Sequence, residues 1–270
     1  MSLRLAALLA ALALPQAAQA CSAGNPSSCA SDMTSQPASS ADAGPATGAG
    51  DPIDLASGNN YRADVDYRLP ATDGLALSRH YNSHGRGSGA LGGGWQLGTD
   101  ASLTLLAPIG GRPRVQITQG DGRPLTFTTT SAQIGEGRVP RDGATLLSAL
   151  PSDGGVHYDS KGWTWRWQDG RSLRFGRQGL LLWIDDGHGE RLELGHDSTG
   201  RLLGWRDQVG HSVRLVYQGM GQFDQSNPPR GRLIEAVLPD GGKIHYHYDP
   251  QGQLKQVDEA DGRQLRYTYR

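Results

Sequence analysis

The sequence predicts an all-β protein whose C-terminal part is a strip of stacked β-hairpins. Two observations lead to this prediction. Residues 189–270 repeat with a fixed period, and short runs of alternating polar and apolar residues, separated by glycine, continue from residue 51 to the end. The chain also has 39 glycines in 270 residues, about twice the ordinary share of roughly 7%. No helix longer than a turn or two is expected after residue 20.

Glycine recurs in two interleaved series. The first series is Gly189, Gly210, Gly241 and Gly262, and the second is Gly179, Gly200, Gly231 and Gly252. Successive members of both series are 21, 31 and 21 residues apart, so one repeat carries ten extra residues, which we place near 218–229. A period and an insertion shared by two series indicate a repeat architecture.

Each repeat unit contains two runs that are typical of strands. Ser212–Tyr217 and Lys243–Tyr248 mix polar, β-branched and aromatic residues near period two. The linkers between runs are Asp-Gly, Gly-Gly or Ser-Thr-Gly, which tolerate positive φ. Each unit is therefore expected to be a β-hairpin. A lone hairpin is marginally stable in water, so the units are expected to stack edge to edge.

The repeat motif resembles the YD repeat of RHS (rearrangement hotspot) proteins. Tyr248–Leu254 followed by Asp261–Tyr269 carries the resemblance most fully; His196–Leu202 is the same motif with His for Tyr, and Tyr158–Gly162 is a weaker copy. The resemblance covers residues 156–270. It implies a β-strip that winds into a hollow shell, here partial and open because the repeats are too few to close it. In bacterial toxins of the family, such a shell encloses a C-terminal toxin domain.

A second block has the order of motifs that the same family places before its repeats. Asp51–Tyr61, Asp64–Tyr67, Leu75–Ser83 and Leu91–Trp95 resemble the conserved N-terminal domain of unknown function of many RHS proteins. The start departs slightly from that pattern, with Ala49-Gly50-Asp51 where Gly-Asn is common. We assign residues 51–155 to this domain, expected to be β-sandwich-like, and residues 156–270 to the repeats.

Further strands are expected between these two blocks. Ser102–Leu106, Arg114–Thr118 and Pro124–Thr129 have the strand pattern. Asp121-Gly122 and Gly110-Gly111 are expected to form the turns between them.

Three tryptophans alternate along one run near the start of the repeats. Side chains alternate at period two on a strand, so Trp163, Trp165 and Trp167 are expected on one face. Such a stripe is more often the buried side of a sheet. The alternative is a platform on which glycan rings stack, which would make the protein a stand-alone carbohydrate-binding module of the cell surface.

The N-terminus has the features of a secretory signal. Arg4 precedes an apolar run, Leu5–Leu14, and Ala18-Gln19-Ala20 is a small-x-small cleavage site, so cleavage is expected after Ala20. The apolar run is shorter than the roughly 20 residues that span a bilayer. The mature chain is therefore expected in the periplasm, at the cell surface or outside the cell. Residues 21–50 are rich in Ala, Ser, Gly and Pro and are expected to form a disordered tether.

Both cysteines lie in the tether. Cys21 would be the first residue of the mature chain, where a cysteine suggests lipid attachment. A disulfide between Cys21 and Cys29 is the alternative, plausible in an oxidising compartment. The sequence leaves both open.

The sequence contains no recognised motif of an enzyme active site. The sequence has no Gly-x-Ser-x-Gly elbow, no phosphate-binding loop and no His-Glu-x-x-His. Its net charge of −1, with no basic run, argues against a nucleic-acid partner. We therefore predict no catalytic residue, no metal site and no cofactor.

The leading interpretation follows from the resemblance. The chain is expected to be a secreted, non-enzymatic structural and delivery part of an RHS-type polymorphic toxin, forming the start of a β-shell. Its expected partners are the remaining shell repeats or a toxin domain, in a longer product or a second chain. A surface glycan is the partner in the alternative.

Overall fold

The computed structural model describes residues 60–69, 76–84, 88–130, 139–219 and 231–269. All regular structure in these ranges is β, apart from two short 3-10 helices, η2 (Gly98–Asp100) and η3 (Pro151–Asp153). The predicted all-β fold is confirmed. Within the same ranges, no helix is both long enough and apolar enough to cross a membrane.

The N-terminal part forms two small sheets. A three-stranded antiparallel sheet, the N-terminal sheet, has the order β1 (Tyr61–Arg68), β2 (Ala76–Asn82), β5 (Trp95–Leu97). Between β2 and β5, the short strands β3 (Ser88–Gly89) and β4 (Gly92–Gly93) pair with each other.

The rest of the chain forms one fifteen-stranded sheet, in which each strand pairs antiparallel with its neighbours in sequence. The strands are β6 (Ser102–Ile109), β7 (Arg112–Thr118), β8 (Pro124–Thr129), β9 (Thr145–Leu147), β10 (Gly155–Asp159), β11 (Gly162–Arg166), β12 (Ser172–Gly176), β13 (Leu181–Asp185), β14 (Arg191–His196), β15 (Leu202–Arg206), β16 (Ser212–Tyr217), β17 (Leu233–Val237), β18 (Lys243–Tyr248), β19 (Leu254–Asp258) and β20 (Gln264–Arg266). The position chosen for a domain boundary, 155/156, lies inside β10, and the sheet crosses it without a break.

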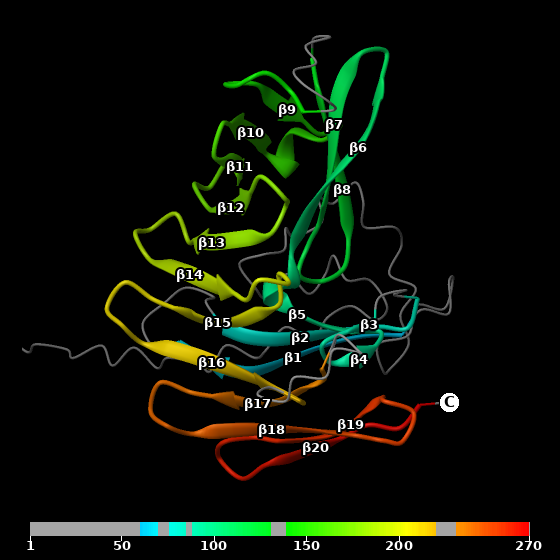
Figure 1. Ribbon diagram of the computed structural model, residues 1–270, viewed down its shortest axis with the longest axis vertical. Coiled ribbons are helices and arrows are strands. Elements are labelled where there is room, and N and C mark those ends of the chain that lie inside the picture. Colours follow the sequence, from blue (N-terminus) through cyan, green and yellow to red (C-terminus); the bar gives the residue numbers. More distant parts are fainter. Residues whose placement is uncertain (1–59, 70–75, 85–87, 131–138, 220–230, 270) are drawn as a thin grey trace, which may run out of the picture.

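The long sheet bends back on itself (Figure 1). Strands β8 and β9 share only two residue pairs, Thr128↔Leu147 and Thr129↔Leu146, and there the direction of the sheet changes. The strands β6–β8 thus face the first repeats, and the rings of Phe127 in β8 and Trp165 in β11 lie 5.7 Å apart. One continuous hydrophobic core results.

The two glycine series mark the turns at the two ends of the strands. Gly179, Gly200 and Gly252 lie in the turns before β13, β15 and β19, and Gly189, Gly210, Gly241 and Gly262 lie in the turns that close the intervening hairpins. The stacked hairpins of the prediction are therefore present. The insertion placed near 218–229 falls between β16 and β17, and most of it lies outside the described residues.

Most hairpin turns of the repeats are three residues long with a left-handed glycine. In the turn before β19, Asp249 N–H donates to Gln253 O at 3.0 Å, Gly252 N–H donates to Asp249 O at 2.9 Å, and Gly252 has φ +79°. This is a type I turn closed by a glycine bulge, one of the common hairpin connections. The carboxylate of Asp249 accepts the N–H groups of Gln251 and Gln253, so the aspartate of the YD motif fixes the turn.

Candidate functional site

The N-terminal sheet lies against the last repeats, although the two are far apart in sequence. The N–H of Leu233, the first residue of β17, donates to Ala90 O at 2.9 Å. A Cβ on Gly92, which has φ +99°, would lie 2.7 Å from Gly252 O in the turn before β19. The backbones therefore approach too closely for any other residue at position 92.

A buried arginine in β2 occupies the centre of this junction. The side chain of Arg79 is 0% exposed, and so is that of its partner Asp66 in β1. Arg79 Nε donates to Asp66 Oδ2 at 2.7 Å, and Nη2 donates to Oδ1 at 2.8 Å. This bidentate geometry is typical of the strongest side-chain ion pairs.

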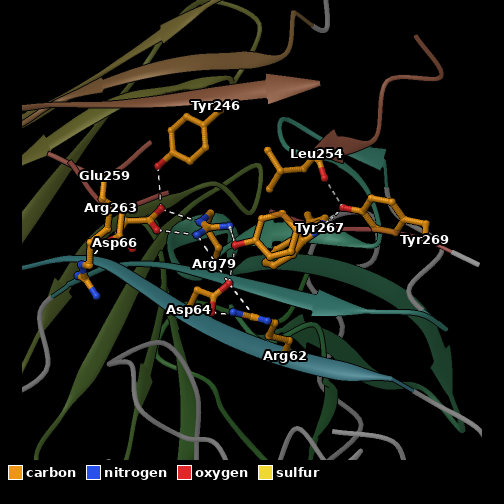
Figure 2. A network of polar contacts seen from close by, with 11 residues as sticks. Arg62, Asp64, Asp66, Arg79, Tyr246, Leu254, Glu259, Arg263, Tyr267 and Tyr269 are labelled. Atoms are coloured by element: carbon orange, nitrogen blue, oxygen red, sulfur yellow. Dashed lines mark hydrogen bonds and ion pairs between the residues drawn. The ribbon is translucent and has the colours of Figure 1, made fainter. Parts of the chain in front are cut away.

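Tyrosines of the last repeats complete the contacts of this pair (Figure 2). Tyr246 in β18 donates its hydroxyl to Asp66 Oδ2 at 2.8 Å, and Tyr267 donates to Asp64 Oδ2 at 2.8 Å. Arg79 Nη1 donates to the Tyr267 hydroxyl oxygen at 3.0 Å. We call Asp64, Asp66, Arg79, Tyr246 and Tyr267 the Arg79 network. It joins residues separated by up to 203 positions in the sequence.

Aromatic rings surround the guanidinium group. Its carbon lies 5.1 Å from the ring centre of Trp95, 5.9 Å from that of Tyr246 and 5.7 Å from that of Tyr267. Such contacts attract a cation to the ring faces. Trp95 also donates its Nε1–H to the hydroxyl oxygen of Tyr269 at 2.8 Å.

The network holds its charges fixed. Burial lowers the pKa of Arg79, but the charge and hydrogen bonds of Asp66 more than offset this and raise the pKa well above its usual value. Burial, together with the charge of Asp66, raises the pKa of Tyr246 well above its usual value. Arg79 therefore stays charged and Tyr246 stays a neutral hydrogen-bond donor across the physiological pH range.

A tyrosine at the YD position of a repeat forms a hydrogen bond that closes the repeat unit. Tyr217, Tyr248 and Tyr269 donate their hydroxyls to the carbonyl oxygens of Leu202, Leu233 and Leu254, at 2.6, 2.6 and 2.5 Å. Each bond spans 15 residues and joins the two ends of one repeat unit. His196 stands at the equivalent place opposite Leu181, so the first unit lacks this phenol.

Removing one of these hydroxyls is expected to destabilise the strip. Tyr248→Phe leaves the carbonyl of Leu233 without its donor, so we expect the free energy of unfolding to fall by about 1–1.5 kcal/mol in urea denaturation. Tyr67→Phe is the matched control, because no hydrogen bond of its hydroxyl is seen among the described residues, and should change the value by less than about 0.5 kcal/mol. Equal effects of the two substitutions would contradict the role given to Tyr248.

Asp197, the aspartate of the motif copy His196–Leu202, gives a pH-dependent prediction. Burial raises the pKa of Asp197, but hydrogen bonds from Thr199 and Arg201 outweigh it and lower the pKa to about 2. The folded pKa lies below the unfolded value of about 3.9, so the ionised carboxylate stabilises the fold above pH 4, and this contribution disappears as the pH falls through 2.

The side chain of Asp197 is 20% exposed, so solvent screening limits the effect to about 1 kcal/mol. We expect Asp197→Asn to be less stable than the wild type by this amount in urea at pH 6 and equally stable at pH 2. A difference that stays constant from pH 6 to pH 2 would show that the carboxylate charge has no such role.

The three tryptophans lie in the core. Trp163, Trp165 and Trp167 are 1%, 0% and 3% exposed, and the rings of Trp165 and Trp167 are 3.9 Å apart. The interpretation as the buried side of a sheet agrees with this structure. The alternative of a glycan platform does not, because no ring face is open to a sugar. The cleavage site after Ala20, together with Cys21 and Cys29, lies outside the described residues.

Sequence reasoning missed the Arg79 network. Asp64 and Asp66 stand two residues apart, as do Leu77 and Arg79, so each pair shares a face of its strand. The local sequence pattern does not predict that Asp66 and Arg79 are buried, because the tyrosines that bind them come from β18 and from the segment after β20. In the described part of the chain, no three His, Cys, Asp or Glu side chains come together as a metal site would need.

The geometry defines the class of protein: a repeat protein of stacked antiparallel hairpins whose first strands are bonded to its last repeats. Two family models match the chain. Residues 50–127 match the Domain of unknown function (DUF6531), and residues 229–264 match the RHS Repeat. The chain thus carries a DUF6531 domain followed by RHS repeat sequence.

Relatives of known name are distant in sequence. Probable deoxyribonuclease RhsA of Dickeya dadantii is 28% identical over 241 residues, which make up 81% of this chain and 16% of that protein. Probable deoxyribonuclease RhsB of the same organism is 27% identical, with the same coverage. Double-stranded DNA deaminase toxin A of Burkholderia cenocepacia is 27% identical over 236 residues, 81% of this chain and 15% of that protein. The chain thus spans a small part of the length of these much longer RHS proteins.

Proposed function

We propose that the chain is the secreted, non-enzymatic structural and delivery part of an RHS-type polymorphic toxin, and that it forms the first wall of a β-shell. The observation that carries the proposal is the unbroken fifteen-stranded sheet, whose last strands are covered on one face by the chain's own N-terminal sheet. In β18, Ile244 and Tyr246 point to the covered face, while Lys243, His245 and His247 point to solvent.

This arrangement of the sheet is suited to the wall of a β-shell. A curved sheet with a covered inner face and a polar outer face can enclose a second object without exposing its core. The remaining repeats and the toxin domain would come from a longer product or a second chain. The relatives support this, since they are much longer and two are named deoxyribonucleases and one a deaminase toxin.

Export is part of the proposal. A signal that ends at Ala20 would place Cys21 at the start of the mature chain and deliver it to the periplasm, the cell surface or the medium. N-terminal sequencing of the secreted product should begin at Cys21. A product that stays in the cytoplasm with Met1 in place would refute this part.

The intact mass of the native product from its own cells tests the shell. We expect a mass far above that calculated for Cys21–Arg270, or a stoichiometric second chain that stays bound through purification. A product that matches Cys21–Arg270 in mass and purifies alone would contradict the shell proposal.

A further inference from the structure

A cavity of about 630 Å³ lies where the N-terminal sheet, the start of β6 and the repeat turns meet. Its size is in the range of pockets that bind small molecules. The N-terminal part contributes Trp95, Thr99 and Asp100, and the repeats contribute His196 and Arg201. A ligand here would therefore contact both the N-terminal part and the repeats.

Two neighbouring residues of η2, Thr99 and Asp100, line this cavity. Asp100 accepts the N–H of Leu97 at 2.9 Å through Oδ2, and no hydrogen bond to its Oδ1 is found among the described residues. Thr99 is 7% exposed, and its hydroxyl oxygen is buried with no hydrogen-bond partner among the described residues. A buried polar atom without a partner is rare and unfavourable. A ligand that donates a hydrogen bond to it would remove this cost.

The charged side chains around the cavity make no ion pair with Asp100 in the described part of the chain. Arg201 is occupied by Asp197, at 2.9 Å. Burial lowers the pKa of His196, so its imidazole is neutral at pH 7. The charge of His80 in β2 lowers the pKa of Asp100. The Nδ1 atom of His80 is hydrogen-bonded to the Tyr61 hydroxyl at 2.7 Å. No ion pair to Asp100 is found within the described ranges.

We propose that this cavity binds a small organic cation that carries a primary ammonium group. The ammonium would pair with the Asp100 carboxylate, and a rotation of the buried Thr99 side chain would bring its hydroxyl oxygen within reach of the same group. A neutral ligand would not relieve the buried charge, and an anion would be repelled by it. The group could belong to a free diamine or to a lysine side chain. The proposal does not depend on the shell role.

Calorimetric titration of the full chain with 1,5-diaminopentane at pH 7.5 tests the proposal, with 1,5-pentanediol as the uncharged control. We expect binding of the diamine and none of the diol. Asp100→Asn should weaken diamine binding at least about tenfold, since it removes the charge but keeps an acceptor for Leu97. Asp142→Asn, an exposed carboxylate away from the cavity, should leave binding unchanged. Equal binding of diol and diamine, or an Asp100→Asn affinity within twofold of the wild type, would overturn the proposal.

A second ligand distinguishes a lysine side chain from a free diamine as the source of the ammonium group. Nα-acetyl-lysine methylamide should bind as well as the diamine if the site takes a lysine side chain, and much more weakly if it takes free diamines. Failure of both ligands to bind the wild type would overturn the proposal.

The wild-type pH profile keeps the test valid if Asp100→Asn does not fold. Burial raises the pKa of Asp100 to about 6, against hydrogen bonding by Leu97 and the charge of His80, which lower it. Protonation of this carboxyl removes the attraction, and protonation of His196 adds repulsion. Affinity for the diamine should therefore be constant between about pH 7 and pH 9, where the ligand stays charged, and fall about tenfold per pH unit below 6. An affinity unchanged between pH 7.5 and pH 5 would overturn the proposal.

Discussion

Arg79→Met should lower the free energy of unfolding by about 3–5 kcal/mol, because it leaves the buried carboxylate of Asp66 without its ion-pair partner. The substitution keeps most of the volume of the side chain, so packing changes little. Tyr267 also loses the donor Nη1 of Arg79. Urea denaturation followed by tryptophan fluorescence measures the change.

Arg174→Met is the matched control for this substitution. Arg174 also makes two bonds to a carboxylate, Asp159, at 2.8 and 2.6 Å, but that carboxylate is 39% exposed. Water can replace the lost partner there, so we expect a loss below about 1 kcal/mol. Arg79→Met combined with Asp66→Leu should recover part of the stability, because it removes the orphaned charge. Similar losses for Arg79→Met and Arg174→Met would mean that the Arg79 network does not stabilise the junction.

Trp165→Ala is expected to have a comparable effect, a loss of about 3–5 kcal/mol, because it opens a cavity between β8 and β11. The ring is 0% exposed and packs against Phe127 and Trp167. Its Nε1–H donates to Asp153 O at 2.7 Å, and this buried carbonyl would lose its donor.

Trp183→Ala is the control for the core tryptophan. Trp183 is half-buried, with the guanidinium of Arg191 4.2 Å from its ring centre, so its removal should cost about 1 kcal/mol. Both variants are compared by urea denaturation at one pH. If Trp165→Ala were as mild as the control, the face-to-face packing of β8 on β11 would be refuted.

The strands and turns could be predicted from sequence because they depend on local rules. Lys243–Tyr248 and Ser212–Tyr217 were placed at the observed bounds, since alternation and flanking glycine fix a strand and its turns within a few residues. The burial of Trp163 and Trp165 also follows from alternation, because one face of a strand in a curved sheet must cover the core.

The junction could not be predicted, because it depends on pairs distant in sequence. Asp66 and Tyr246 are separated by 180 positions and look like ordinary polar strand residues. Only the path of the whole sheet brings them together. The continuity of the sheet across residues 155 and 156 could not be predicted either. Each strand there pairs antiparallel with its neighbours in sequence, so the local pattern of residues does not change at the expected domain boundary.

Hydrogen–deuterium exchange of the full chain tests most directly whether the N-terminal sheet and the last repeats form one unit. We expect the amides of β1 and β2 to exchange with the same free energy of opening as those of β17, β18 and β19, and Arg79→Met to lower the free energy of opening of both sets together. Faster, independent exchange of β1 and β2, with β17, β18 and β19 unaffected by Arg79→Met, would contradict this expectation.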